Sequence, residues 1–226
     1  MSSTPITREQ WKLMAVLSLF WGTLFGALGI FFPYYSLYLK EDLGLTGQQV
    51  GTAMGVFHLI GLIGQPAWGY IADRTGSRKL VVVILSTGMA LGFVAFWFVE
   101  KYAMLLLVSA GFAAFYTSLI PQGMALGLGL LYRSNNSHFE WVRAFGSVGF
   151  LVTCFGFPYL LDAMKTESGG SNMGLLFPCS AAIILLTTVT VFFIPNQEAI
   201  REKAEPGSWR RLFADSRCIR FFIYVF

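Results

Sequence analysis

Two ionisable side chains, His58 and Arg143, lie inside long apolar stretches of the sequence rather than at their ends. Burying an ionisable group in hydrocarbon is costly, so each is a candidate functional residue. The sequence contains no H-E-x-x-H or G-x-S-x-G motif, and no carboxylates cluster inside the apolar stretches. It therefore predicts solute binding or proton exchange rather than enzymatic catalysis.

His58 belongs to a stripe of small and polar residues. Spacings of three or four residues would place the stripe on one helix face, and its members are Gly51, Gly55, His58, Gly61 and Gln65. One interpretation is a cavity-lining face on which His58 binds substrate or exchanges a proton. The other is a helix-packing face, in which glycines allow close approach and a neutral imidazole bonds to a neighbour.

Arg143 begins a second stripe. Arg143, Ser147, Phe150 and Cys154 share one face of their predicted helix. Arg143 either faces a cavity or extends its side chain to the membrane surface from about one turn inside.

Six apolar runs must position these residues. Hydrophobic residues make up 55% of the 226-residue chain and charged residues only 12%, which indicates a membrane protein. Each run reaches the roughly 20 residues that cross hydrocarbon as helix, and none alternates as a barrel strand would. The sequence predicts an all-α membrane protein with spans 11–39, 47–72, 80–99, 103–132, 139–161 and 173–194.

The distribution of positive charge predicts the orientation. With a cytoplasmic N-terminus, only Lys40, Lys101 and Lys165 would lie outside, which leaves thirteen of the sixteen Lys and Arg residues on the cytoplasmic side. We therefore expect a multi-pass protein of the cell (inner) membrane. The net charge of +4 does not indicate nucleic-acid binding, because the basic residues lie in loops that flank apolar runs, where they set the topology.

The order of segments suggests half of a larger protein. We expect a cytoplasmic tail over 1–10, a six-helix bundle over 11–194, a cytoplasmic linker over 195–218 and the start of a seventh membrane helix over 219–226. Prolines recur at offsets of 88 and 92 residues (Pro33 and Pro121, Pro66 and Pro158). The chain thus reads as two inverted three-helix repeats, the N-terminal half of a twelve-helix protein.

The short loop between the second and third spans carries the pattern Gly-x-x-x-Asp-Arg-x-Gly-x-Arg-Lys. It resembles the signature loop of major facilitator superfamily transporters, with every defining position filled: Gly69, Asp73, Arg74, Gly76, Arg78 and Lys79. The resemblance implies a conformational latch that favours one of two access states. The alternative is a capped hairpin with no switching role.

Three further stretches resemble the lactose permease group of oligosaccharide and nucleoside proton symporters: residues 143–150, 32–35 and 65–66. This resemblance implies that Arg143 contacts substrate and that Phe150 stacks on it. Other candidate binding residues are His58, Ser147, Gln65, Gln122 and Tyr34.

One departure from that group concerns the partner of the arginine. The permease pairs it with a glutamate on span four, where this sequence offers only Tyr116, Thr117, Ser118 and Gln122. An unpaired buried guanidinium is costly, so either Arg143 is better hydrated or the substrate supplies an anion. Nucleosides, other sugars and carboxylated compounds all stay open as substrates.

The function predicted is secondary transport of a small organic solute with protons, by rocking of two helix bundles. The alternatives are an uncoupled facilitator or exporter and a non-transporting receptor. The sequence lacks a G-x-x-x-x-G-K-[ST] phosphate loop and metal-ligand spacing of its cysteines, so no cofactor or metal is expected. The expected partners are the solute, protons, the lipid bilayer and a C-terminal helix bundle, but not nucleic acid.

Overall fold

The computed structural model describes residues 7–134, 138–164 and 173–196. These residues form six helices long and apolar enough to cross a membrane, and they confirm the six predicted spans. The helices are α1 (Arg8–Glu41), α2 (Gly47–Thr75), α3 (Arg78–Trp97), α4 (Tyr102–Arg133), α5 (Phe139–Ala163) and α6 (Leu176–Phe193), and a short 3-10 turn, η1 (Met173–Leu175), precedes α6.

The ends of the helices differ from the predicted spans by a few residues. α1 begins at Arg8, inside the segment 1–10 predicted as a tail, because Thr7 and Gln10 form a capping box. The side chain of each residue accepts a hydrogen bond from the backbone N–H of the other. The predicted linker from residue 197 onward and the predicted start of a seventh helix over 219–226 lie outside the described residues.

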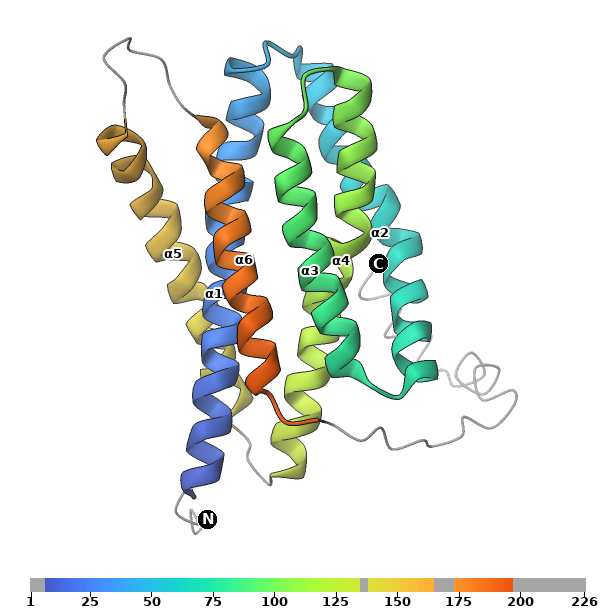
Figure 1. Ribbon diagram of the computed structural model, residues 1–226, viewed down its shortest axis with the longest axis vertical. Coiled ribbons are helices and arrows are strands. Elements are labelled where there is room, and N and C mark those ends of the chain that lie inside the picture. Colours follow the sequence, from blue (N-terminus) through green and yellow to red (C-terminus); the bar gives the residue numbers. More distant parts are fainter. Residues whose placement is uncertain (1–6, 135–137, 165–172, 197–226) are drawn as a thin grey trace, which may run out of the picture.

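The six helices form two triplets that repeat one packing pattern. α1 packs on α5 and α6, and α4 packs in the same way on α2 and α3. If α1, α2 and α3 are exchanged with α4, α5 and α6 in that order, the contacts of α1 become those of α4. The contact between α3 and α6 is unchanged by this exchange. In Figure 1, α1, α3 and α5 run in one direction and α2, α4 and α6 in the other. The fold therefore consists of two inverted three-helix repeats.

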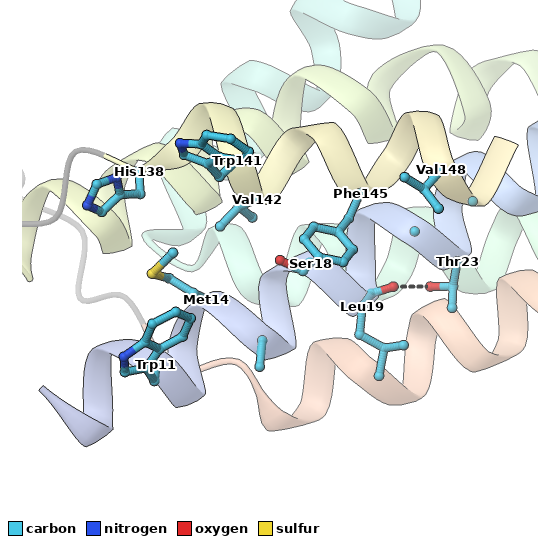
Figure 2. A pocket seen from close by; sticks show the side chains of 13 residues that line it. Trp11, Met14, Ser18, Leu19, Thr23, His138, Trp141, Val142, Phe145 and Val148 are labelled. Carbon is cyan, nitrogen blue, oxygen red and sulfur yellow. Dashed lines mark hydrogen bonds between the residues drawn. The ribbon is translucent and has the colours of Figure 1, made fainter. Parts of the chain in front are cut away.

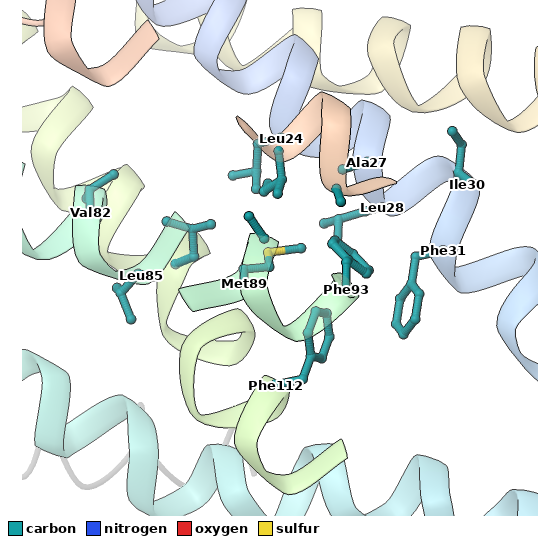
Figure 3. Packing of buried hydrophobic residues seen from close by; sticks show 14 of the residues in the cluster. Leu24, Ala27, Leu28, Ile30, Phe31, Val82, Leu85, Met89, Phe93 and Phe112 are labelled. Carbon is teal, nitrogen blue, oxygen red and sulfur yellow. The ribbon is translucent and has the colours of Figure 1, made fainter. Parts of the chain in front are cut away.

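Aromatic side chains fill the interior at the end of the bundle where α1 finishes. The buried Phe31 ring lies 5.2 Å from both Phe93 of α3 and Phe112 of α4, between centroids. Figure 3 shows these three rings beside the aliphatic side chains of Leu28 and Met89. Tilted and edge-to-face ring pairs stabilise such a cluster beyond the area that they bury.

Hydroxyl groups provide the polar contacts between helices. Thr188 of α6 donates to Ser86 of α3 at 2.9 Å, and Thr187 of α6 donates to Thr23 of α1 at 3.0 Å. Interhelical hydrogen bonds and close packing, rather than apolar burial, hold helices together in lipid. These two hydrogen bonds join α6 to α3 and to α1.

Glycines bring α1 and α5 into backbone contact. A Cβ added at Gly149 would lie 2.0 Å from the carbonyl oxygen of Gly22, and one added at Gly29 would lie 2.5 Å from that of Phe150. Thr153 of α5 donates to the carbonyl oxygen of Gly26 at 2.8 Å. This contact fixes the position of α5 on α1, and with it the position of Arg143.

Candidate functional site

An open pocket of about 920 Å³ lies between α1, α2 and α4. Among its lining residues are Phe32 of α1, His58 and Gln65 of α2, and Tyr116 and Thr117 of α4, whereas α3 and α6 contribute none. Two of the predicted binding residues, His58 and Gln65, therefore line one pocket. Phe32, Tyr116 and Thr117 were not among the predicted binding residues.

His58 hydrogen-bonds within its own helix. Its Nδ1 lies 3.3 Å from the carbonyl oxygen of Met54, one turn earlier on α2, and the side chain is exposed. In the tautomer that donates from Nδ1, the other ring nitrogen is left as an acceptor; a protonated ring would donate from both. The imidazole can thus change from acceptor to donor when it takes up a proton.

The glycines of the His58 stripe divide between packing and open surface. A Cβ added at Gly61 would lie 3.1 Å from the Thr117 side chain, so this glycine is a packing position. A Cβ at Gly51 or Gly55 would have nothing within 4 Å. Most of the stripe, His58 and Gln65 included, therefore faces open space rather than a neighbouring helix.

The pocket combines rings with backbone acceptors. The Phe32 and Tyr116 rings lie 5.4 Å apart, between centroids, across the α1–α4 contact. Pro66 and Pro121 lie inside α2 and α4 and also line the pocket. A proline removes the hydrogen bond to the carbonyl four residues earlier, so the carbonyls of Leu62 and Thr117 lack that donor. The lining suits a solute with an apolar body and a few donor groups.

Arg143 lies outside this pocket and packs on α1. Its guanidinium carbon is 4.7 Å from the ring centroid of Phe25 and 5.3 Å from that of Trp21. Both rings belong to the middle of α1, so the side chain turns toward the interior of the bundle rather than toward the helix end. Neither Trp21 nor Phe25 was among the predicted contacts of Arg143. The available signal was the i, i+4 spacing of two aromatic residues on α1.

Arg143 and the pocket share a face of α1. Phe25, below the guanidinium, and Phe32, in the pocket, are seven residues apart and so lie on one helix face. At 1.5 Å per residue their separation along the axis is about 10 Å. Along the axis of α1, the ring that contacts Arg143 and the ring that lines the pocket are therefore about two turns apart.

The structure places the four other predicted binding residues outside the pocket. Tyr34 donates its hydroxyl to the carbonyl oxygen of Cys154 at 2.8 Å and so links α1 to α5. Phe150 is half-buried against the core, and Ser147 is exposed. Gln122 is buried, and its Nε2 would lie 3.8 Å from a Cβ added at Gly69.

The loop between α2 and α3 is held at both ends. Gly76 ends α2 in the left-handed conformation, with φ of 66°, which glycine adopts without strain, and its N–H donates to the carbonyl of Ala72. Asp73 Oδ1 lies 3.4 Å from Arg78 Nη2, while Arg74 donates to the Tyr70 hydroxyl at 3.2 Å. The Asp73 carboxylate thus pairs with Arg78.

Lys79 reaches out of the loop to the other repeat. Its Nζ donates to the carbonyl oxygens of Phe192 at 2.9 Å and Ile194 at 2.5 Å, at the end of α6. A cation at a helix C-terminus satisfies terminal carbonyls and complements the helix dipole. This residue therefore joins the start of α3 to the end of α6.

A second pocket, of about 840 Å³, lies between α1 and α5 near the start of both helices. Figure 2 shows that its lining is mainly apolar, with Trp11 and Trp141 at one end. It contains none of the predicted binding residues. Exposed tryptophans near helix ends are typical of a membrane interface, so we do not place the solute site here. In the described ranges no three His, Cys, Asp or Glu side chains are grouped to hold a metal.

Comparison with known proteins gives the family. The model of the MFS_1 like family matches residues 13–223. The uncharacterized transporter YwbF of Bacillus subtilis is 28% identical over 94% of this chain and 51% of its own length. A probable 3-phenylpropionic acid transporter of Escherichia coli is 31% identical over 71% of this chain and 44% of its own.

A solved structure agrees on the fold. The nucleoside transporter NupG superposes with a TM-score of 0.75 at 17% identity, over 94% of this chain and 53% of that chain. The chain therefore spans about half the length of the relatives it matches, and they are transporters rather than enzymes. With six membrane helices, a matching fold and a family model that covers nearly all of its sequence, this integral membrane protein belongs to the MFS_1 like family of the major facilitator superfamily.

Proposed function

We propose that this bundle is the N-terminal half of a secondary transporter that moves a small organic solute together with protons. The observation that carries the proposal is the open pocket between α1, α2 and α4, which α3 and α6 leave uncovered. A second six-helix bundle would close this face, as expected from relatives about twice as long. Solute would then pass by rocking of the two bundles around the pocket.

His58 is the proposed proton-exchanging group on this half. It lines the pocket near the middle of α2, and imidazole is the side chain that changes charge near neutral pH. A guanidinium offers five N–H donors in a planar fork, so Arg143 is the proposed solute-binding cation of this half. Uncoupled facilitation or export by the same fold is the alternative.

The test of coupling uses the complete transporter in proteoliposomes with an imposed proton gradient. We expect accumulation of solute above equilibrium that an uncoupler abolishes, and equilibration that survives it. His58→Gln should equilibrate solute without accumulating it. Accumulation that persists with the uncoupler would contradict proton coupling, and the absence of any solute uptake would contradict transport and favour a receptor.

We also propose that the α2–α3 loop acts as the latch between access states, on the cytoplasmic side of the inner membrane. Asp73 is exposed and its pair with Arg78 is long, at 3.4 Å, so the carboxylate is available to a second bundle. Asp73→Asn should insert normally but transport more slowly. Normal turnover in this variant would leave the loop as a capped hairpin only.

A further inference from the structure

The second pocket, of about 840 Å³, is a groove between α1 and α5 that has the length of one bilayer leaflet. Its lining extends from Trp11 to Thr23 on the first helix and from His138 to Gly149 at the start of the second. At 1.5 Å per residue these stretches are about 18 Å and about 17 Å long. The hydrocarbon of one leaflet is about 15 Å thick. A lipid acyl chain therefore matches the α1–α5 groove, whereas a membrane-spanning helix would extend far beyond it.

The inner end of this groove is closed where three helices meet. A Cβ added at Gly149 would lie 2.0 Å from the carbonyl oxygen of Gly22, so the two backbones touch there. One turn further along α1, a Cβ added at Gly26 would lie 3.4 Å from Thr153 of α5 and 3.7 Å from Ile183 of α6. A chain that enters from the starts of the helices can thus reach only about the middle of the bilayer.

The lining of the α1–α5 groove is apolar, and its open end carries two tryptophans. Leu19, Phe145 and Val148 line it with side chains that are more than half exposed. None of the described residues that line it is Asp, Glu, Lys or Arg. Trp11 and Trp141 are exposed at the open end (Figure 2), at the level expected for the boundary between hydrocarbon and headgroups. The groove therefore suits a molecule with an apolar chain and a polar group beyond the tryptophans.

Two cations continue the groove face of α1 beyond the tryptophan. Arg8 lies seven residues before Ala15, and Lys12 lies seven residues before Leu19, so both share the face that lines the groove. Both side chains are exposed. Lys12 is partly neutralised by Glu9, at 2.8 Å, so Arg8 contributes more of the positive charge at this end.

The acids at this end of the bundle lie on other helix faces. Glu9 is seven residues before Val16 on α1, and Glu140 is seven residues before Ser147 on α5. Neither Val16 nor Ser147 lines the groove. The face that leads into the groove is therefore positively charged.

The α1–α5 groove is separate from the pocket that contains His58. Thr23, at the inner end of the groove, accepts a hydrogen bond from Thr187 of α6, whereas α6 contributes nothing to the lining of the other pocket. The α1 residue in that pocket is Phe32, nine residues and about 14 Å beyond Thr23. A molecule in the groove would not compete with the solute.

We propose that the α1–α5 groove binds an anionic phospholipid. One acyl chain lies along the groove from Trp11 to Gly22, and the phosphate, at the level of the headgroups, binds Arg8 and more weakly Lys12. With the N-terminus in the cytoplasm, the lipid comes from the cytoplasmic leaflet, whose surface is negatively charged.

Lipids that differ only in the headgroup test this proposal on the purified complete transporter. Binding of dioleoyl phosphatidylglycerol, which is anionic, and dioleoyl phosphatidylcholine, which is zwitterionic, can be compared by native mass spectrometry. We expect the anionic lipid to bind roughly 5- to 20-fold more tightly, as for one or two cations at the membrane surface. Equal affinities would show that lipids contact the surface without selection, and would overturn the proposal.

Charge variants then locate the headgroup. Arg8→Gln should lower the preference for phosphatidylglycerol roughly 5-fold, and Lys12→Gln should lower it by less, because Glu9 already offsets that charge. Lys40→Gln is the matched control, since Lys40 is an exposed cation at the opposite end of α1, and it should leave the preference intact. A preference that survives the double variant Arg8→Gln, Lys12→Gln would overturn the site.

A variant that fills the groove locates the acyl chain. Ala15 is exposed and lines the groove, so the ring of Ala15→Phe would occupy the space of the chain and abolish the preference. Ala182→Phe adds the same ring at an exposed position of α6 outside the groove and should change nothing. Unchanged binding of phosphatidylglycerol in Ala15→Phe would overturn the placement of the chain between α1 and α5.

Discussion

The α1–α5 pair and the α4–α2 pair occupy equivalent places in the two repeats but pack to different depths. A Cβ at Gly149 would lie 2.0 Å from a backbone oxygen of α1, whereas one at Gly61 would lie 3.1 Å from the end of a side chain of α4. The first pair is in backbone contact at Gly22 and Gly149, and its pocket lies toward the starts of the two helices. The second pair lines the pocket that contains His58.

This difference separates the two chemical groups of the site. The α1–α5 pair holds the Arg143 cation over the rings of α1, where the backbone contact between the helices fixes its position. The α4–α2 pair leaves His58 and Gln65 exposed to a solute. The two repeats therefore share one packing pattern, and the positions of their glycines determine how closely the helices of each pair approach.

The largest expected effect comes from adding a methyl group to each pair. Gly149→Ala should lower the free energy of unfolding by about 3 kcal/mol, since backbone cannot move aside as a side chain can. Gly61→Ala should lower it by about 1 kcal/mol or less, because Thr117 can adjust. Reversible unfolding in mixed micelles measures both.

Gly156→Ala is the matched control for this comparison. It lies on α5 with nothing within 4 Å of the added Cβ, so its free energy of unfolding should equal that of the wild type or exceed it by up to about 1 kcal/mol, because alanine favours helix over glycine. Equal losses at Gly149 and Gly61 would show that the two pairs are packed alike, contrary to the structure.

A smaller difference should appear when threonines are replaced by valine. Thr153 donates across the α1–α5 contact to Gly26, while Thr117 donates to Ala113 of its own helix. Thr153→Val should therefore lower the free energy of unfolding by about 1 kcal/mol, and Thr117→Val should leave it nearly unchanged. If Thr117→Val lowered the free energy of unfolding more than Thr153→Val in the same assay, the hydrogen bond from Thr153 to Gly26 would not stabilise the α1–α5 contact.

The smallest effect concerns the contact between α3 and α6, which Lys79 joins. Lys79→Gln should lower the free energy of unfolding by about 0.5 kcal/mol, because the cation at the end of α6 is lost. Lys79→Arg keeps the charge and should lose less. If Lys79→Gln and Lys79→Arg lowered the free energy of unfolding equally, the contact between α3 and α6 would not depend on this cation.

Sequence alone predicted the helices because the bilayer restricts the choices. Each apolar run must satisfy its backbone internally, so it becomes a helix whose length follows the hydrocarbon thickness. The four helix prolines also revealed the repeat. The signature loop was recognisable because Gly76 must adopt a left-handed conformation at a fixed place.

Only the tertiary structure decided what the polar residues contact. His58 and Gln65 share a pocket with Tyr116, and Arg143 lies over Trp21 and Phe25, more than a hundred residues earlier. Periodicity places a residue on a face of its helix, but the neighbour of that face depends on how closely glycines let other helices approach. The sequence thus determined the six spans, their inverted order and the lack of an acid on the fourth span, whereas packing determined that Arg143 contacts the rings of Trp21 and Phe25.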